Sequence, residues 1–256
     1  MKRPGLAALQ KALAAVLSAQ KKADKPLAVL LAGHNGSGKS TLWYERLAPT
    51  LRLPLINADR MMLSVLPECD VDSRLPDWAT KLRDTDASWM AVAQKGVLAF
   101  VALAMGQKVP FAMETVFSHL RKNPDGRVES KIDLIRDMQR AGYFVLLVFV
   151  GLSNVHLSIG RVQSRKDRGG HDVPVKKLLE RFPRTQEVME LAMGVADASL
   201  LMDNRRDWPK AFTVCRVQIG DTTHFDIRNG NQRPTEIMEW LPIVSPQGGD
   251  HDRSES

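Results

Sequence analysis

Cysteine is scarce in this chain, which has only Cys69 and Cys215 among its 256 residues. Two cysteines make neither a disulfide framework nor a zinc-binding pattern. So few thiols are typical of a reducing compartment, and we therefore expect a cytoplasmic protein. A chain of this length can bury a sufficient hydrophobic core without covalent cross-links.

Aromatic residues are also few, at 6% of the chain, and the only tyrosines are Tyr44 and Tyr143. Proteins that bind single-stranded nucleic acid stack the bases on aromatic side chains set among basic ones, and this pattern is missing. The net charge of +7 is the only feature of the sequence that would favour a nucleic-acid partner. Because the basic residues are spread along the chain, this charge favours anionic ligands in general, and we do not expect nucleic-acid binding.

We expect no apolar segment of the sequence to be long enough to span a membrane. Residues 1–22 begin with basic and small residues, as a signal peptide does, but Gln10 and Lys11 interrupt the apolar part. The leucines and valines of this segment recur at helical spacing. We therefore expect an amphipathic helix over about residues 5–22 that packs on the domain, and no membrane partner.

Short apolar runs alternate with segments of helical spacing along the rest of the chain. The expected strands cover residues 26–33, 53–57, 109–115, 143–152 and 197–204. One expected helix begins near residue 39. Four others cover residues 87–105, 128–141, 155–168 and 175–193, and the last of these is expected to be kinked or divided at Pro183. Strands that are apolar along their whole length are typical of a parallel sheet with helices on both faces. We expect helix 87–105 to be buried, because it is almost entirely apolar.

No linker divides the chain, so we expect a single domain over residues 1–243. It would comprise the N-terminal helix, a core over residues 26–204 and a small C-terminal appendage over residues 205–243. The stretches FTVCRVQIGD and THFDIRNG predict a β-hairpin in that appendage. Residues 244–256 are polar and are expected to be disordered.

The segment Gly33 to Ser40 matches G-x-x-x-x-G-K-[ST], the P-loop pattern, between an expected strand and an expected helix. Glycines let the backbone bend around an anion, and the amide groups at the helix start point toward it. Lys39 is placed to reach the β- and γ-phosphates of ATP, and the Ser40 hydroxyl to bind Mg²⁺. The fold class is thus an α/β P-loop NTPase fold in three layers. The residues expected to bind the nucleotide are Gly33, His34, Asn35, Gly36, Ser37, Gly38, Lys39, Ser40 and Thr41.

Acidic residues follow two further strands. Asp59 stands at the end of the second expected strand and Glu114 at the end of the third. Functional groups gather beyond the carboxyl ends of parallel strands, so both should lie beside the P-loop. Asp59 can accept the proton of an attacking hydroxyl, or it can simply cap the helix that starts at Arg60. Glu114 can hold Mg²⁺ or a substrate hydroxyl, with Thr115 and Ser118 lining the same cleft.

Three arginines, Arg161, Arg165 and Arg168, share one face of an expected helix. A triphosphate that undergoes transfer needs cations around its oxygens, and Gly169-Gly170 would give such a helix the hinge of a closing lid. The alternative is a solvated basic face or a nucleic-acid patch. His171 in this loop is expected to shape the lid or to touch the nucleotide.

A P-loop alone does not distinguish a kinase from a nucleotide-dependent switch or motor. A GTPase should carry an N-K-x-D motif, and the chain has none. The P-loop, the two acids and the arginines together favour a small-molecule kinase. The alternatives left open are a kinase of another metabolite or of a nucleic-acid end, and a nucleotide-binding regulator without activity.

The chain resembles the zeta toxin family of P-loop kinases, in its short chromosomal branch. Six stretches carry the resemblance: GHNGSGKST, INADR, ETVFSH, GYFVLLVFVGL, GRVQSRKDRGGHDVPVKKLLERFPR and ADASLLMDN, which lie between residues 27 and 204. The resemblance implies an ATP- and Mg²⁺-dependent kinase that phosphorylates the 3′-hydroxyl of UDP-N-acetylglucosamine. It also implies an antitoxin protein as a candidate partner.

The resemblance assigns roles to individual residues. Lys39 and Ser40 would hold ATP and Mg²⁺, Asp59 would be the general base, and Glu114 would contact substrate or metal. The lid arginines would stabilise the transferring phosphoryl group; Arg161 matches the family position best, and Arg165 and Arg168 compete for the second. The chain departs from the family at Val116 and Ser118, where the best-studied toxins carry a threonine and then an arginine.

Overall fold

The computed structural model describes residues 5–70, 75–118, 120–122, 128–168, 172–204, 211–231 and 233–247. The Gly169-Gly170 hinge and His171, which we expected in a lid, lie outside the described residues, as does most of the expected tail.

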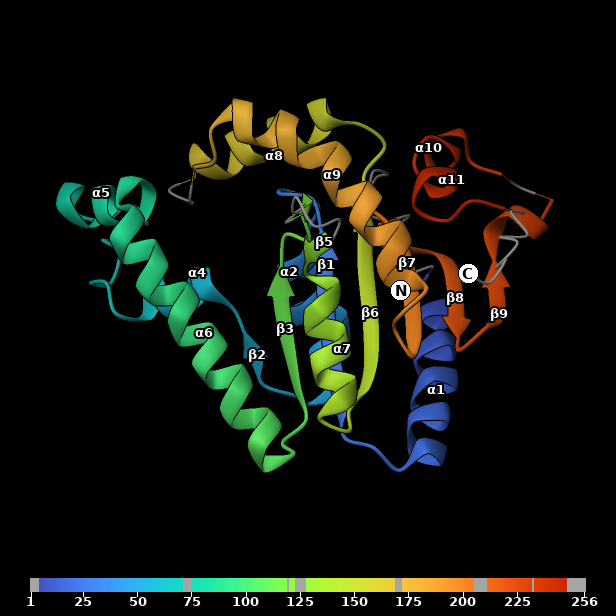
Figure 1. Ribbon diagram of the computed structural model, residues 1–256. Helices are drawn as coiled ribbons and strands as arrows, with labels where there is room; N and C mark the ends of the chain where they lie inside the picture. Colours follow the sequence, from blue (N-terminus) through green and yellow to red (C-terminus); the bar gives the residue numbers. More distant parts are fainter. Residues whose placement is uncertain are drawn as a thin grey trace.

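Seven strands form one sheet in the order β2-β3-β1-β6-β7-β8-β9 (Figure 1). The strands are β1 (Leu27–Gly33), β2 (Leu55–Ile56), β3 (Phe111–Thr115), β6 (Phe144–Gly151), β7 (Ala198–Asp203), β8 (Thr213–Ile219) and β9 (Thr222–Asp226). The pairings from β2 to β7 are parallel, and those of β8 and β9 are antiparallel. The predicted α/β fold with a mostly parallel sheet and a C-terminal hairpin is therefore confirmed.

The helices lie on both faces of this sheet. They are α1 (Leu6–Ala23), α2 (Lys39–Leu42), a π-helical turn (Trp43–Leu47), α3 (Ala48–Leu51), α4 (Ala58–Ser64), α5 (Asp77–Thr85), α6 (Ala87–Gln107), α7 (Ile132–Arg140), α8 (Val155–Lys166), α9 (Val175–Met193), a 3₁₀ turn (Ile227–Asn229), α10 (Thr235–Met238) and α11 (Leu241–Val244). Pro183 does not divide α9. A separate hairpin pairs β4 (Leu120–Lys122) with β5 (Val128–Ser130), so the helix expected from residue 128 begins only at Ile132.

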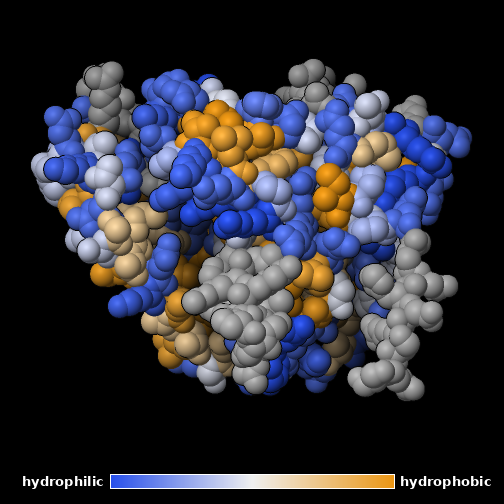
Figure 2. Space-filling view, turned by 45° about the horizontal axis from the view of Figure 1, so that its top comes forward, coloured by the Kyte–Doolittle hydropathy of each residue, from blue (hydrophilic) through white to orange (hydrophobic). Residues whose placement is uncertain are grey.

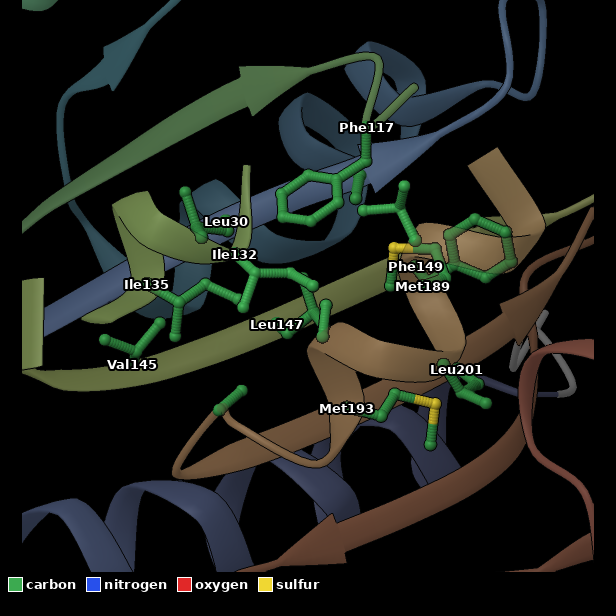
Figure 3. Packing of buried hydrophobic residues seen from close by; sticks show 14 of the residues in the cluster. Leu30, Phe117, Ile132, Ile135, Val145, Leu147, Phe149, Met189, Met193 and Leu201 are labelled. Atoms are coloured by element: carbon green, nitrogen blue, oxygen red, sulfur yellow. The ribbon is translucent and has the colours of Figure 1, made fainter. Parts of the chain in front are cut away.

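Two hydrophobic clusters cover the two faces of the sheet. One joins alternate residues of β1, β3 and β6 to α6, α7 and α9, and Figure 3 shows part of it, with Leu30 and Leu147 facing Ile135 and Met189. The other joins the remaining residues of these strands to α1, α2 and the turns after α2. Burial on both faces explains why these strands are apolar throughout.

The expectation that residues 87–105 form a buried helix is half wrong. The helix forms, but of its side chains only Ala93, Val97 and Val101 are buried, and Phe100 is 56% exposed. A helix that is apolar all round can be buried on every side only where other elements surround it. Here α6 packs on α4 beside β2, a strand of two residues at the end of the sheet, so its outer side stays open.

The same helix corrects the expectation of no apolar segment long enough for a membrane. Among the described residues, α6 meets the length and composition of a membrane-spanning helix. Core helices and signal sequences also meet these two criteria, so the finding does not place the protein in a membrane.

The C-terminal appendage is anchored on the sheet by Trp240. Its ring is fully buried and lies edge-on to Phe149, 5.7 Å between ring centroids. It also covers Gly151, where any side chain would collide with it, and its Nε1 donates to Asp203 Oδ1 at 3.1 Å. The appendage thus contacts β6 and β7 at their carboxyl ends, close to the loop that follows β1.

We expect the appendage to unfold together with the core. Replacement of Trp240 by alanine should lower the free energy of unfolding by about 3–5 kcal/mol, as expected for a fully buried aromatic side chain. Urea unfolding of the whole chain measures this. Trp78→Ala is the control, because Trp78 is 58% exposed and should change stability by less than about 0.5 kcal/mol. Equal effects of the two substitutions would contradict the packing of the appendage on the core.

Candidate active site

The P-loop connects β1 to α2 and is held from outside by Asn204, which follows β7. The Asn204 side-chain amide donates to the Ser37 carbonyl oxygen at 2.7 Å. It also lies so close to Gly38 that a Cβ there would collide with it. Gly38 has φ of +91°, a left-handed conformation that disfavours other residues. The left-handed backbone thus favours glycine at this position, and a larger residue would also displace the Asn204 amide that holds Ser37.

Arg161 of α8 fixes the other side of the loop. Its guanidinium donates to the carbonyl oxygens of Asn204 at 2.6 Å and of Gly36 at 3.4 Å. Burial lowers the pKa of Arg161, and the nearby Asp203 carboxylate partly opposes that shift. The structure thus brings this predicted arginine to the P-loop, with its charge directed at backbone carbonyls.

Lys39 lies inside the loop and is 6% exposed. Its Nζ donates to the carbonyl oxygens of Gly33 at 3.1 Å and of His34 at 2.9 Å. Burial lowers the pKa of Lys39, whereas the carboxylates of Glu114 and Asp59 raise it. Both acids predicted at strand ends therefore lie close enough to interact with this ammonium group.

Glu114 is the centre of the polar contacts at this edge of the sheet. Its carboxylate accepts hydrogen bonds from Ser40 Oγ at 3.0 and 3.2 Å and from Asn57 Nδ2 at 2.7 Å. Lys39 Nζ lies 4.0 Å from the same group. Glu114 is next to Leu31 in the parallel pairing of β1 with β3, and the P-loop leads from β1 to Ser40. This explains how Ser40 and Glu114, which are 74 positions apart in the sequence, meet.

Asn57 is a residue of this site that the sequence analysis did not single out. Its Oδ1 accepts from the amide of Arg60 at 3.1 Å and so caps α4, while its Nδ2 holds Glu114. The helix cap is therefore Asn57 and not Asp59, which sits in the first turn of α4. Asparagine just before a helix start is a common cap, and this signal was available in the sequence.

The other predicted residues are placed less closely. Arg165 is exposed, and its charge contributes to the lowered pKa of Lys39, after burial. Arg168 is also exposed, but its charge is not among those that shift the pKa of Lys39. Figure 2 shows that the face carrying α8 and α9 is largely hydrophilic around a smaller apolar area. Thr115 and Ser118 are half-buried near the end of β3, and among the described residues neither side chain is hydrogen-bonded to Glu114.

The arrangement suits a magnesium ion better than a metal held by many protein ligands. Within the described ranges no three His, Cys, Asp or Glu side chains gather as metal ligands. Mg²⁺ is usually held by one or two carboxylates together with substrate phosphates and water. The Ser40 hydroxyl and the Glu114 carboxylate, already in contact beside Lys39, fit this requirement.

His34, the second residue of the P-loop, is 2% exposed and packs between aromatic rings. Its ring stacks on Phe182 of α9 with centroids 3.8 Å apart and meets Phe149 edge-on. Burial, with a smaller contribution from Lys39, lowers its pKa to about 3. His34 is therefore a neutral imidazole at neutral pH and links the loop to α9.

Comparison with known proteins places these residues in a family. The profile of the zeta toxin family matches residues 13–197. An uncharacterized protein of Haemophilus influenzae is 27% identical over 145 residues, which cover 56% of this chain and 84% of that protein.

Two solved structures have a similar fold. The PezAT chromosomal toxin-antitoxin system of Streptococcus pneumoniae matches with a TM-score of 0.50 at 13% identity, over 94% of this chain and 90% of that one. The AvrRxo1-ORF1:-ORF2 complex with ATP matches with a TM-score of 0.57 at 16% identity, over 94% and 71%. At these identities the likeness establishes the fold alone.

The buried neutral His34 should make the protein sensitive to acid. Its folded pKa lies below the ordinary 6.5, so the unfolded chain binds the extra proton between pH 6.5 and about 3. Stability from this group is therefore full above pH 6.5 and falls by up to about 1.4 kcal/mol per pH unit below it. His34→Phe keeps the ring stack and should remove this part of the loss. Urea unfolding at pH 7.5 and 5.0 compares the two proteins, and equal losses would contradict the assignment.

Asn57→Ala should destabilise the chain by more than the loss of a helix cap. The cap is worth about 1 kcal/mol, and loss of the bond to the Glu114 carboxylate should add a further 1–2 kcal/mol or so. Asn154→Ala is the matched control, because Asn154 caps α8 through Leu157 N without holding an acid. Urea unfolding gives both values; an Asn57 effect no larger than the Asn154 effect would show that the bond to Glu114 contributes nothing.

Proposed function

The chain belongs to the zeta toxin family, and on this premise we propose that it is a kinase that transfers the γ-phosphate of ATP to a hydroxyl of a nucleotide sugar. Family membership and the P-loop support a kinase-like function and the use of ATP. The first candidate acceptor is the 3′-hydroxyl of UDP-N-acetylglucosamine. The observation that carries the proposal is the contact of Ser40 with Glu114 beside Lys39 and within reach of Asp59.

In this proposal the P-loop amides and Lys39 bind the phosphates of ATP. Lys39 is held within the loop by the carbonyl oxygens of Gly33 and His34 and would exchange these bonds for a phosphate of ATP. Ser40 and Glu114 would hold Mg²⁺, which neutralises charge on the β- and γ-phosphates when it is bound. Asn57 would keep Glu114 in place for that role.

Asp59 is proposed as the general base that takes the proton of the attacking hydroxyl. It is exposed at the start of α4, so an acceptor can reach it, and its charge is felt by Lys39. Arg165 is proposed as the cation that stabilises the transferring phosphoryl group, since its charge influences the pKa of Lys39 in the P-loop. Arg161 would stabilise the same phosphoryl group from the side of the P-loop. Arg168 is the weaker candidate for this role.

The remaining roles are extensions of the same proposal. Thr115 and Ser118 would line the acceptor cleft after Glu114. A toxin-antitoxin system is named for the pneumococcal relative, and an antitoxin is proposed here as a partner by analogy. A cytoplasmic location would supply both ATP and nucleotide sugars.

The test is incubation of the purified chain with ATP and Mg²⁺, with and without UDP-N-acetylglucosamine. We expect a singly phosphorylated sugar nucleotide by mass spectrometry together with ADP. Asp59→Asn should lower the rate by about 10²–10⁴-fold, the usual contribution of a general base, and Lys39→Ala should abolish it. Asp77→Asn is the matched control, since Asp77 occupies the first turn of α5 as Asp59 does that of α4.

Two results would count against the proposal. ADP that forms at the same rate without the sugar nucleotide, and no phosphorylated product, would exclude this acceptor. No ATP turnover with any hydroxyl acceptor, and no effect of Lys39→Ala on ATP binding, would contradict a kinase altogether.

A further inference from the structure

Trp240 of the C-terminal appendage contacts the carboxyl ends of both β6 and β7. Gly151 is the last residue of β6 and pairs with Asp203, the last residue of β7. The indole Nε1 of Trp240 donates to Asp203 Oδ1 at 3.1 Å, and its ring fills the place that a Cβ of Gly151 would take. Asp203 and Trp240 are fully buried, so solvent does not compete for this hydrogen bond.

Asn204, the residue that follows β7, connects this strand end to the P-loop. Its backbone N–H donates to the Gly151 carbonyl oxygen at 3.3 Å, so its position depends on a residue that Trp240 covers. Asn204 also contacts the nucleotide site in two ways. Its side-chain amide donates to the Ser37 carbonyl oxygen, and its own carbonyl oxygen accepts from Arg161. A change at the end of β7 is therefore transmitted directly to the loop.

Arg161 is held at the loop by acceptors that carry no net charge. They are the backbone carbonyl oxygens of Asn204 and Gly36, and the Arg161 Cβ lies so close to Gly36 that a side chain there would press on it. Burial opposes the charge of Arg161 and lowers its pKa, whereas the Asp203 carboxylate raises this pKa and offsets part of the effect. The charged form of Arg161 therefore depends on the carboxylate that Trp240 holds.

A second side chain from this part of the chain contacts the P-loop directly. The Phe212 ring lies 3.4 Å from the position that a Cβ of Gly38 would take, and the Arg46 guanidinium lies over the same ring, 5.0 Å from its centroid. Phe212 has φ of +57°, which is rare for a bulky residue and persists where the surrounding contacts fix it. All these supporting residues except Arg46 lie after residue 197, where the match to the family profile ends.

We propose that Trp240 is a positioning residue of the nucleotide site, which acts through Asp203 and Asn204 to hold Arg161 and the P-loop in the conformation that binds ATP. The inference rests on the proposed function for the identity of the nucleotide. It gives the appendage a role in ATP binding in addition to its contribution to stability. Trp240 is fully buried and does not itself contact the nucleotide.

Trp240→Phe tests the hydrogen bond while an aromatic ring remains against Phe149. Calorimetric titration with a non-hydrolysable ATP analogue and Mg²⁺ should give a Kd about tenfold higher than that of the wild type, as expected for loss of a hydrogen bond to a charged group. Asp203→Asn keeps an oxygen acceptor for Trp240 but removes the charge near Arg161, and it should also weaken binding. Affinities within twofold of the wild type in both variants would overturn the proposal.

Asp197→Asn is the matched control for a loss of stability alone. Asp197 lies just before the amino end of β7, and its carboxylate accepts from the Val145 amide at 2.8 Å and from Gln139 Nε2 at 3.1 Å. This variant should unfold at a lower urea concentration than the wild type and bind the analogue equally well. If it weakens analogue binding as much as Trp240→Phe does, the tryptophan acts through stability only and the proposal is wrong.

A double-mutant cycle tests the route from Trp240 to the loop. In an Arg161→Gln background, Trp240→Phe should weaken analogue binding by clearly less than the tenfold expected in the wild type, because one of its targets is already lost. The same tenfold loss in both backgrounds would show that Trp240 does not act through Arg161. None of these titrations needs an acceptor, so a failure to phosphorylate any sugar nucleotide would contradict the proposed function without deciding this inference.

Discussion

The parallel pairing of β1 with β3 on one side and with β6 on the other is the constraint on which the site depends. It places Gly33, Glu114 and Val150 at the same edge of the sheet, although they are separated by long stretches of sequence. Each of these strands is buried on both faces, so a shift of the register would move apolar side chains out of two cores at once. The positions of the P-loop and of the strand-end acid are therefore fixed by core packing and need little from the loops themselves.

The charged groups at this edge of the sheet lie close together, and their opposite charges stabilise one another. Lys39 loses solvation through burial, and the carboxylates of Glu114 and Asp59 recover part of the cost of its charge. Glu114 in turn is held by Ser40 and Asn57. A triphosphate with its metal ion would bring both signs of charge into the same space, and the lysine and the acid are positioned to receive one each. Asn57 holds Glu114 and also caps α4, the helix that carries Asp59. The acid that would bind metal and the acid that would take a proton are therefore positioned by the same residue.

The sequence predicts best what depends on neighbouring residues. The P-loop, the apolar strands and α9 follow from local patterns, and the structure confirms them. Local patterns could not give the partners of Arg161, which are backbone carbonyls from two other segments, or the contact of His34 with Phe182. They also mispredicted α6, because apolar residues around a whole helix show that it can be buried but not whether other elements cover it. The roles of Asp59, Arg165 and Arg168 stay predictions, since residue placement alone does not test chemistry.

The C-terminal appendage determines which strand forms one edge of the sheet. Without β8 and β9, the fully apolar strand β7 would present a row of free backbone groups to any other unpaired strand. The hairpin replaces that edge with β9, a short strand rich in threonine, and the pairing of β8 with β9 carries an irregularity after Val217. At the opposite end, β2 has only two residues. Both borders of the sheet are thus poor templates for strand addition, which protects a highly apolar sheet against self-association through its edges.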